Sequence, residues 1–370
     1  MRLHLPLQLA KLGPAIRTIT MITSDDLDSI KYLPCLRSRR AEMRGYSELN
    51  PETKQGLIPL VSIGKLGATS SVEQVLGNVK RTFSRAFIDL NCNGNQVCAD
   101  YETYLNSDNN YSEWRDLFSA DENYVPTAVF APGGNVRSFI RQVMEIERKH
   151  GVVAIRSKNG AQDLAAIQSA ISAVDDVNNV LFIFDFGYVR GAISPREAEA
   201  RRLISALRMI DSSARIALVG SSYPRSVAAY GEESGALEIE ERELHAQVGG
   251  DAVAIYGDHS SIYPEPFEPS ISRFVPRIDY CLADSWIYRR YRDRANVSGY
   301  VHCANSVLES ADWDPAFAQR SWGAAKIQET ASGVPAGFAA PANWIAARVN
   351  MHIERQWMST IVDEDNDVDF

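Results

Sequence analysis

Three aspartates end apolar runs that have the length of β-strands: Asp89 in AFIDL, Asp185 in VLFIFDF and Asp258 in IYGD. Carboxylate oxygens are the ligands that hard cations such as Mg²⁺ and Ca²⁺ prefer. Without a metal, carboxylates held close together raise one another's pKa and can supply a general acid and a general base. We therefore predict Asp89, Asp185 and Asp258 as catalytic residues, and as ligands if a divalent cation such as Mg²⁺ is bound. The alternative is that each aspartate forms a structural ion pair with an arginine.

A second set of polar residues follows apolar runs or lies near their ends, and we predict that it binds a ligand. The set comprises Arg37, Arg39, Arg156, Ser221, Ser222, His259 and Arg289. A planar guanidinium binds phosphate or carboxylate through two parallel hydrogen bonds, and serine hydroxyls are common phosphate donors. The predicted ligand is therefore an anionic small molecule or a nucleotide. The alternative is that the arginines only neutralise the aspartates and that His259 is an ordinary hydrogen-bonding residue.

The segment GSSYP at 220–224 has a superficial likeness to a serine nucleophile elbow. It lacks the glycine two residues after the serine, and no histidine is placed beside it by the sequence. We therefore do not predict a serine hydrolase.

The C-terminal third of the chain concentrates tryptophans and arginines. Arg289–Arg294 is the one basic cluster in an acidic chain. Aromatic rings beside arginines can stack bases and bind phosphates, so this cluster is a candidate contact for a protein or a nucleic acid. The alternative is that the aromatic residues pack the C-terminal part against the rest while the arginines face water.

Eight short runs rich in β-branched and aromatic residues alternate with segments of helical period. The runs are Tyr32–Leu36, Leu57–Ser62, Ala86–Leu90, Thr127–Ala131, Val152–Arg156, Val180–Phe186, Arg215–Gly220 and Ala252–Gly257. Most are continuously apolar, as strands covered on both faces require. Eight such units predict an α/β fold of the closed (β/α)₈ TIM type. The alternative is an open doubly wound sheet, but Cys35–Arg40 carries no glycine-rich turn after the first run.

Between the runs, helix starts are predicted at Ser70 with Glu73 and at Ser194 with Glu197, each fitting a capping box. The polar stretch 91–124 reads as an insertion that is helical only around Ser112–Phe118. Beyond the eighth run, Tyr280–Tyr291 predicts strand or hairpin structure. Helices are predicted at Ser306–Gln319, Trp322–Thr330 and Asn343–Trp357.

The predicted organisation is a loose leader at 1–24, a barrel at 25–265, a C-terminal extension at 266–357 that completes or caps the barrel, and an acidic tail at 358–370. The 370 residues carry a formal charge of −9, which argues against general nucleic-acid binding. Five cysteines without a CxxC pair suggest neither a disulfide framework nor a thiolate zinc site. The N-terminal apolar stretch is too interrupted to span a membrane. We expect a cytoplasmic protein without a membrane contact.

Several local patterns, taken together in their order and spacing, resemble the Beta protein family, which is associated with phages and mobile elements. They are YLPCLRSRRAEM, LIPLVSI, FIDL, GSSYP, YGDHSSIYP, WIYRR, SWGAAKI and NWIAARVNMHI, between about residues 31 and 357. The sequence departs from the family pattern at Ala324, where an acidic residue is typical, and at Met351, where a second histidine is typical. The resemblance implies a phage or genomic-island setting and suggests antiviral defence, but it implies no substrate.

Two hypotheses about function follow from these patterns. The first is an enzyme or sensor whose barrel mouth binds a phosphorylated ligand or nucleotide, in its most concrete form a phosphodiesterase-like enzyme. The second is a non-catalytic recognition protein of a phage or defence system that uses its C-terminal part as the partner surface. The fold alone does not choose between them, because this barrel supports many functions.

Overall fold

The computed structural model of the chain describes residues 21–90, 94–131, 133–266, 275–292 and 298–366. The predicted leader therefore lies outside the described residues except for its last four. Of these, Ile22 is fully buried, and Ser24 begins α1 (Ser24–Asp28) behind a capping box formed by Thr23 and Asp26.

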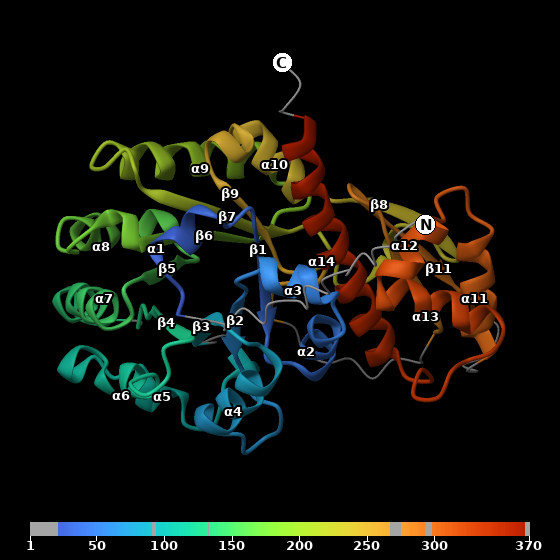
Figure 1. Cartoon of the computed structure of the whole chain (residues 1–370), viewed down its shortest axis with the longest axis horizontal. Coiled ribbons are helices and arrows are strands. Elements are labelled where there is room, and N and C mark those ends of the chain that lie inside the picture. Colours follow the sequence, from blue (N-terminus) through green and yellow to red (C-terminus); the bar gives the residue numbers. More distant parts are fainter. Residues whose placement is uncertain (1–20, 91–93, 132, 267–274, 293–297, 367–370) are drawn as a thin grey trace, which may run out of the picture.

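A barrel of parallel strands forms the centre of the protein (Figure 1). Within the described residues its eight strands are, in order around the barrel, β1 (Tyr32–Arg37), β2 (Leu60–Ile63), β3 (Ala86–Leu90), β4 (Tyr124–Ala128), β5 (Val153–Ser157), β6 (Val180–Tyr188), β7 (Arg215–Ser221) and β9 (Ile255–Asp258). β9 pairs with both β7 and β1, which closes the barrel. The predicted TIM-type barrel is therefore confirmed, and the open doubly wound alternative is excluded because an open sheet would have two unpaired edges.

Each of the eight predicted runs overlaps one barrel strand. The bounds differ most for β4, which begins at Tyr124 and ends at Ala128, where the sequence predicted Thr127–Ala131. β9 begins at Ile255, because Gly250–Ala252 before it forms a 3₁₀ turn. The strands are buried along almost their whole length, which explains their continuously apolar sequences.

Helices cover the outside of the barrel. Following the strands in turn, they are α2 (Arg40–Ser47) and α3 (Pro51–Gly56), α4 (Val72–Thr82), α5 (Tyr101–Tyr104) and α6 (Ser112–Asp116), α7 (Val136–His150), α8 (Gly160–Ile171), α9 (Ile193–Arg208) and α10 (Glu240–Val248). In the described part of the polar stretch after β3, the structure has the short helices α5 and α6 and two 3₁₀ turns; α6 falls in the predicted segment Ser112–Phe118, whereas α5 was not predicted. The stretch is anchored by Trp114, which is fully buried and whose indole N–H donates to the Thr127 carbonyl at 2.9 Å.

Two predicted helix starts differ from the structure. The capping box of α4 uses Ser71 and Gln74, one residue after the predicted pair. The box predicted at Ser194 is wrong, because α9 begins at Ile193 and its N-cap, Ala192, has no side chain that can accept a hydrogen bond.

The last barrel helix is α14 (Pro341–Asn366), far along the chain from the last strand. It packs on α2 and β1 on one side, and Gln356 accepts a hydrogen bond from Arg242 of α10. α14 thus lies between α10 and α2, where the helix of the eighth βα unit belongs. Residues 259–340, between β9 and α14, are therefore an insertion in the last βα connection.

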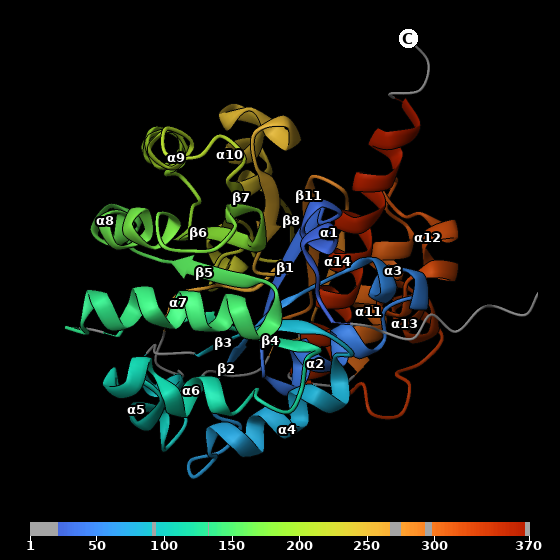
Figure 2. The same ribbon diagram turned by 60° about the vertical axis from the view of Figure 1, so that its left-hand side comes forward.

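This insertion forms most of a small unit beside the barrel. Its antiparallel strands β10 (Arg277–Cys281) and β11 (Ser285–Arg290) confirm the predicted hairpin, and β11 pairs with β8 (Ser234–Glu238), which comes from the connection after β7. The helices α11 (Ser298–Leu308), α12 (Pro315–Arg320) and α13 (Trp322–Ala331) pack around this sheet. Figures 1 and 2 show α14 between the barrel and this unit.

The predicted C-terminal helices differ in their bounds. Ser306–Gln319 is divided between α11 and α12 by a break at residues 309–314, and α14 continues to Asn366 instead of ending at Trp357. Of the helices that the structure describes, none combines the length and the apolar character needed to cross a membrane.

Candidate functional site

A belt of polar side chains crosses the interior of the barrel near the carboxyl ends of the strands. The belt consists of Ser62, Asp89, Thr127, Arg156 and Asp185, one residue from each of the strands β2 to β6. Arg156 is its centre and is only 7% exposed. Successive side chains of a strand point alternately into and out of a barrel. These five polar side chains occupy inward-facing positions near the ends of their strands.

Arg156 bonds to both carboxylates of the belt. Its Nη1 atom is 2.6 Å from Asp89 Oδ2, and its Nη2 and Nε atoms are 2.6 Å and 3.1 Å from Asp185 Oδ2. Burial opposes the charge of Arg156, but the two carboxylates raise its pKa above the ordinary value. The ion-pair alternative therefore describes Asp89 and Asp185 as they stand in the structure.

The remaining oxygens of the two carboxylates are also occupied. Thr127 donates to Asp89 Oδ1 at 3.0 Å, and Ser62 donates at 3.0 Å to Oδ2, the oxygen that also accepts from Arg156. The N–H of Gly187 donates to Asp185 Oδ1 at 2.9 Å, at an irregularity near the end of β6 where Gly187 takes a φ of 61°, a conformation that glycine adopts without strain.

His259 joins this belt from the connection after β9. Its Nε2 atom is 2.9 Å from Asp185 Oδ1. Burial opposes the charge of Asp185, but His259 and Arg156 outweigh burial and hold the pKa of Asp185 well below its usual range. Asp185 is therefore ionised at neutral pH and accepts hydrogen bonds without donating any.

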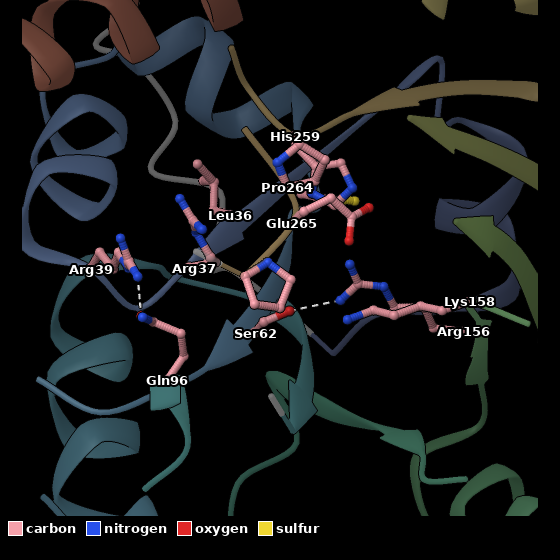
Figure 3. A pocket seen from close by; sticks show the side chains of 12 residues that line it. Leu36, Arg37, Arg39, Ser62, Gln96, Arg156, Lys158, His259, Pro264 and Glu265 are labelled. Carbon is pink, nitrogen blue, oxygen red and sulfur yellow. Dashed lines mark hydrogen bonds between the residues drawn. The ribbon is translucent and has the colours of Figure 1, made fainter. Parts of the chain in front are cut away.

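Above the belt lies a pocket at the barrel mouth, which we call the mouth pocket. It encloses about 520 Å³ of empty space, including the solvent at its opening. Its polar lining consists of Arg37, Arg39, Ser62, Gln96, Arg156, Lys158, His259 and Glu265 (Figure 3). Of the predicted ligand-binding residues, the structure thus brings Arg37, Arg39, Arg156 and His259 together.

The two arginines after β1 differ in their partners. The backbone N–H and Nε of Arg37 donate to Glu42, at 2.7 Å and 2.9 Å, so its charge is largely balanced. Arg39 is half-buried and donates to the amide oxygen of Gln96. Among the described residues no carboxylate pairs with Arg39. Burial, followed by the charge of Arg37, lowers the pKa of Arg39.

Cys35 also lines the mouth pocket but is a poor nucleophile. Burial raises the pKa of its thiol far above the ordinary value. Since the thiolate is the reactive form of cysteine, Cys35 is a packing residue.

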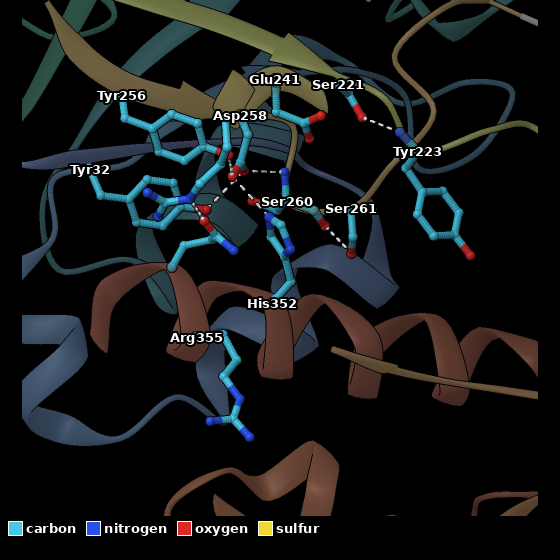
Figure 4. A network of polar contacts seen from close by, with 12 residues as sticks. Tyr32, Ser221, Tyr223, Glu241, Tyr256, Asp258, Ser260, Ser261, His352 and Arg355 are labelled. Atoms are coloured by element: carbon cyan, nitrogen blue, oxygen red, sulfur yellow. Dashed lines mark hydrogen bonds and ion pairs between the residues drawn. The ribbon is translucent and has the colours of Figure 1, made fainter. Parts of the chain in front are cut away.

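Asp258 does not face the mouth pocket. It points out of the barrel toward α14 and is fully buried, and its carboxylate accepts four hydrogen bonds (Figure 4). The Tyr32 hydroxyl and the Ser260 N–H donate to Oδ1 at 2.8 Å and 2.7 Å. The Tyr256 hydroxyl and His352 Nε2 donate to Oδ2 at 3.0 Å and 2.9 Å. With all its acceptor positions used, Asp258 has none left for a cation or a substrate.

The tautomer of His352 follows from its second partner. The indole N–H of Trp286 is 3.2 Å from His352 Nδ1, and an indole nitrogen can only donate. His352 therefore accepts at Nδ1 and donates its Nε2 proton to Asp258. Burial opposes the charge of Asp258, but His352 and the hydrogen bonds from Ser260 and Tyr32 more than offset it and lower the pKa of Asp258.

The sequence contained a signal for the outward direction of Asp258. Side chains alternate along a strand, so Asp258 shares a face with Tyr256, a large aromatic residue suited to packing under a helix. Gly257 is the inward-facing position of β9. The predicted trio of Asp89, Asp185 and Asp258 is thus not brought together, and among the described residues no group of three or more His, Cys, Asp or Glu side chains could hold a metal ion.

The two predicted serines are committed to local structure. Both are fully buried. The Ser221 hydroxyl donates to the Ile262 carbonyl at 3.0 Å, and the Ser222 hydroxyl donates to Glu241. Neither serine lines the mouth pocket.

Arg289 also lies away from the barrel mouth, on β11 of the small sheet. With Arg290, Arg292 and His302 it lines a groove at the end of β11, beside the first residue of β8. Arg292 pairs with Glu232 at 2.9 Å, and Arg290 donates to the Glu232 carbonyl at 3.1 Å. Arg294 lies outside the described residues.

The Beta protein family model matches residues 32–358. "Protein beta" of Enterobacteria phage P4 is 33% identical over 334 residues, which cover 89% of this chain and 93% of the phage protein. The chain belongs to the Beta protein family.

Four of the segments that carry the likeness to the Beta protein family supply two polar networks. YLPCLRSRRAEM and FIDL supply β1, the mouth arginines and Asp89, whereas YGDHSSIYP and NWIAARVNMHI supply the network around Asp258 and the centre of α14. The two positions that depart from the family pattern, Ala324 and Met351, are fully buried in the same apolar cluster. Both departures therefore concern the packing of α13 on α14, away from the mouth pocket.

Several residues of this site were not predicted from the sequence. Ser62 and Thr127 lay in the predicted strands, and a polar residue near the end of an apolar strand was the available signal. Gln96, Lys158 and Glu265 lie in connections between elements, where no pattern in a single sequence indicates which side chains turn toward the mouth.

Proposed function

We propose that the protein binds a phosphorylated small molecule or a nucleotide in the mouth pocket. The observation that carries this proposal is Arg39, a half-buried guanidinium beside Arg37 that forms no ion pair with a described carboxylate, because Glu42, whose charge also acts on Arg39, is paired with Arg37. A cation that is only partly balanced is costly to bury, and an anionic ligand would balance it with hydrogen bonds that are strengthened by charge.

The surroundings of Arg39 support the proposal. Arg39 is the N-cap of α2, and no side chain caps that helix end. The first N–H groups of a helix favour anions, although here this effect only adds to that of the side chains. Lys158, from the connection after β5, also lines the pocket. Barrels of this type carry their ligand sites at this mouth.

In its concrete form the proposed activity is phosphodiesterase-like, within a phage or defence setting. The relative in phage P4 is the support for the phage setting. The acid–base chemistry cannot come from Asp89 and Asp185 as first expected, since both carboxylates are bonded to Arg156. It must come from another group in the pocket.

The binding proposal is tested with inorganic phosphate and a panel of nucleotides by isothermal titration calorimetry. Arg39→Ala is expected to weaken binding by about 1.5–3 kcal/mol, the scale of hydrogen bonds to charged groups. The matched control is Arg81→Ala, at an exposed arginine on α4. Equal affinity in the wild type and Arg39→Ala, or no binding of any of these anions, would contradict the proposal.

The second candidate function is recognition of a nucleic acid or a protein through the groove of Arg289, Arg290 and Arg292. The charges of Arg292 and Arg277 add to burial in lowering the pKa of Arg290, which is a sign of crowded positive charge. Fluorescence anisotropy with a single-stranded oligonucleotide tests this candidate. Arg289→Ala and Arg292→Ala should each lower the affinity for the oligonucleotide and make that affinity less dependent on salt. An unchanged affinity would contradict this candidate function.

A further inference from the structure

We propose that His259 is the general base of a phosphoester hydrolysis in the mouth pocket, with Asp185 as its positioning residue. This inference rests on the proposed function, because it needs a phosphate ester bound beside Arg39. It assigns to a histidine the role that the sequence suggested for the aspartates.

The contact with Asp185 determines which nitrogen of the His259 ring carries the proton. Asp185 is ionised and can only accept, so the Nε2 atom at 2.9 Å from it carries a proton. In neutral His259 the lone pair is then on Nδ1. No hydrogen bond from a described residue occupies Nδ1, and the ring lines the mouth pocket with 11% of its side chain exposed. A base with a free lone pair thus lies at the ligand cavity.

The His259 ring is also held in place. Asp185 is itself fixed by Arg156 and by the Gly187 N–H, so the carboxylate that orients His259 has little freedom. The two residues after His259, Ser260 and Ser261, have φ values of 50° and 61°. Two consecutive left-handed residues other than glycine are unfavourable, and such strain persists where the surroundings impose a particular geometry.

Charged side chains surround His259. His259 faces Asp185, Arg156, Lys158 and Glu265, with Arg37 and Arg39 across the pocket. The cations suit the phosphate and the charge that develops on its oxygens, whereas Asp185 stabilises the imidazolium that forms when His259 takes a proton. A base and anion-binding groups are thus present in one cavity.

The reaction that fits these groups is hydrolysis of a phosphate ester. Nδ1 of His259 takes a proton from water while the water oxygen bonds to phosphorus and the ester P–O bond breaks. The leaving oxygen takes a proton from solvent, and the hydroxide so formed removes the proton from the imidazolium. The sum is ester plus water giving a phosphate with one fewer ester bond plus an alcohol, with no oxidant or reductant required.

The test measures hydrolysis of bis(p-nitrophenyl) phosphate and p-nitrophenyl phosphate by the full chain between pH 5 and 9. His259→Gln is the main variant, because the glutamine amide can keep the hydrogen bond to Asp185 but cannot accept a proton at neutral pH. We expect turnover to fall ~100-fold or more, the usual contribution of general acid–base catalysis, with the affinity for inorganic phosphate kept within a few-fold. The control is Arg81→Ala, at the exposed arginine on α4, which should behave like the wild type.

The role of Asp185 is tested by comparing turnover with phosphate affinity. Asp185→Asn should lower the turnover of both esters while the affinity for inorganic phosphate is kept within a few-fold, because the ring would lose the carboxylate that orients it and balances its charge during the reaction. A purely structural role of Asp185 would lower the amount of folded protein and leave the turnover of each folded molecule unchanged.

The outcomes separate the two proposals. Phosphate binding that depends on Arg39, without hydrolysis of either ester by the wild type, overturns the catalytic inference and leaves the binding function. Hydrolysis that His259→Gln does not reduce also overturns it. Absence of phosphate binding contradicts the proposed function itself. Thermal melting of each variant shows whether it is folded, and the phosphate affinity of His259→Gln shows whether its pocket is intact.

Discussion

The three aspartates that look alike in the sequence have different surroundings in the protein. Asp89 and Asp185 face inward and share one arginine, whereas Asp258 faces outward to tyrosines and a histidine. The sequence gives their positions at strand ends but not their partners, because Tyr32 and His352 are 226 and 94 residues away from Asp258. A pattern within a few residues cannot reveal such distant contacts.

A prediction at the scale of the residue follows for Asp258. In Asp258→Asn one carboxylate oxygen becomes an NH₂ group, which can only donate. It would face two groups that also donate, so at least one buried group would lose its hydrogen-bond partner. We expect the free energy of unfolding to fall by about 3 kcal/mol, as is typical when one member of a buried charged network is changed. Urea denaturation measures this change, and the phosphate affinity of the mouth pocket should remain unaltered.

The control for this prediction is Asp108→Asn, at an exposed aspartate that should tolerate the change. If Asp258→Asn left stability intact and instead abolished phosphate binding, Asp258 would belong to the ligand site after all.

At the scale of the element, the barrel strands were predictable and the added strand was not. Continuous apolar runs of sufficient length marked all eight barrel strands. β8, in contrast, has the short sequence SGALE, in which Leu237 is the one buried residue, and its pairing with β11 depends on an element some 50 residues further on. Strands at the edge of a small sheet have little of the apolar pattern on which such predictions depend.

The turn that carries His259 gives a prediction at the same scale. Glycine adopts the left-handed conformation without the steric cost that serine has, so Ser261→Gly should raise the free energy of unfolding by about 1 kcal/mol. The loss of the buried hydroxymethyl group offsets part of this gain. Chemical denaturation measures the change.

A gain in stability from Ser261→Gly should be accompanied by slower ester hydrolysis if the turn holds His259 in its working position. A loss of stability would show that the serine is not strained at this position. Ser213→Gly, at an exposed serine between α9 and β7, is the comparison for replacing serine by glycine without this constraint.

At the scale of the whole molecule, α14 joins the barrel to the inserted unit. Val349 and Ile353 pack in the apolar cluster around β1 and α2, whereas Ala347 and Met351 pack in the cluster of the small sheet. Between them, polar side chains of α14 bind both sides. Glu354 accepts from Thr53 of α3 at 2.8 Å, and Arg348 bonds to Asp279 of β10 at 2.7 Å. The part that the sequence suggested as an extension is therefore continuous with the barrel core.

This position of α14 leads to a prediction about the chain as a whole. A chain that ends at residue 340 would expose the outer face of β1 and one side of α2, and it would leave Asp258 without His352. We expect it to lack a cooperative unfolding transition in urea and to lack near-ultraviolet circular dichroism, because removing one helix of the ring breaks the single barrel core. A chain that ends at residue 366 keeps α14 and should unfold like the full chain.

A synthetic peptide of residues 341–366 added to the shorter chain should restore a cooperative transition if the barrel and the inserted unit need only this helix to close. A cooperative transition in the shorter chain alone would show instead that the barrel folds without its last helix, and that α14 belongs energetically to the inserted unit.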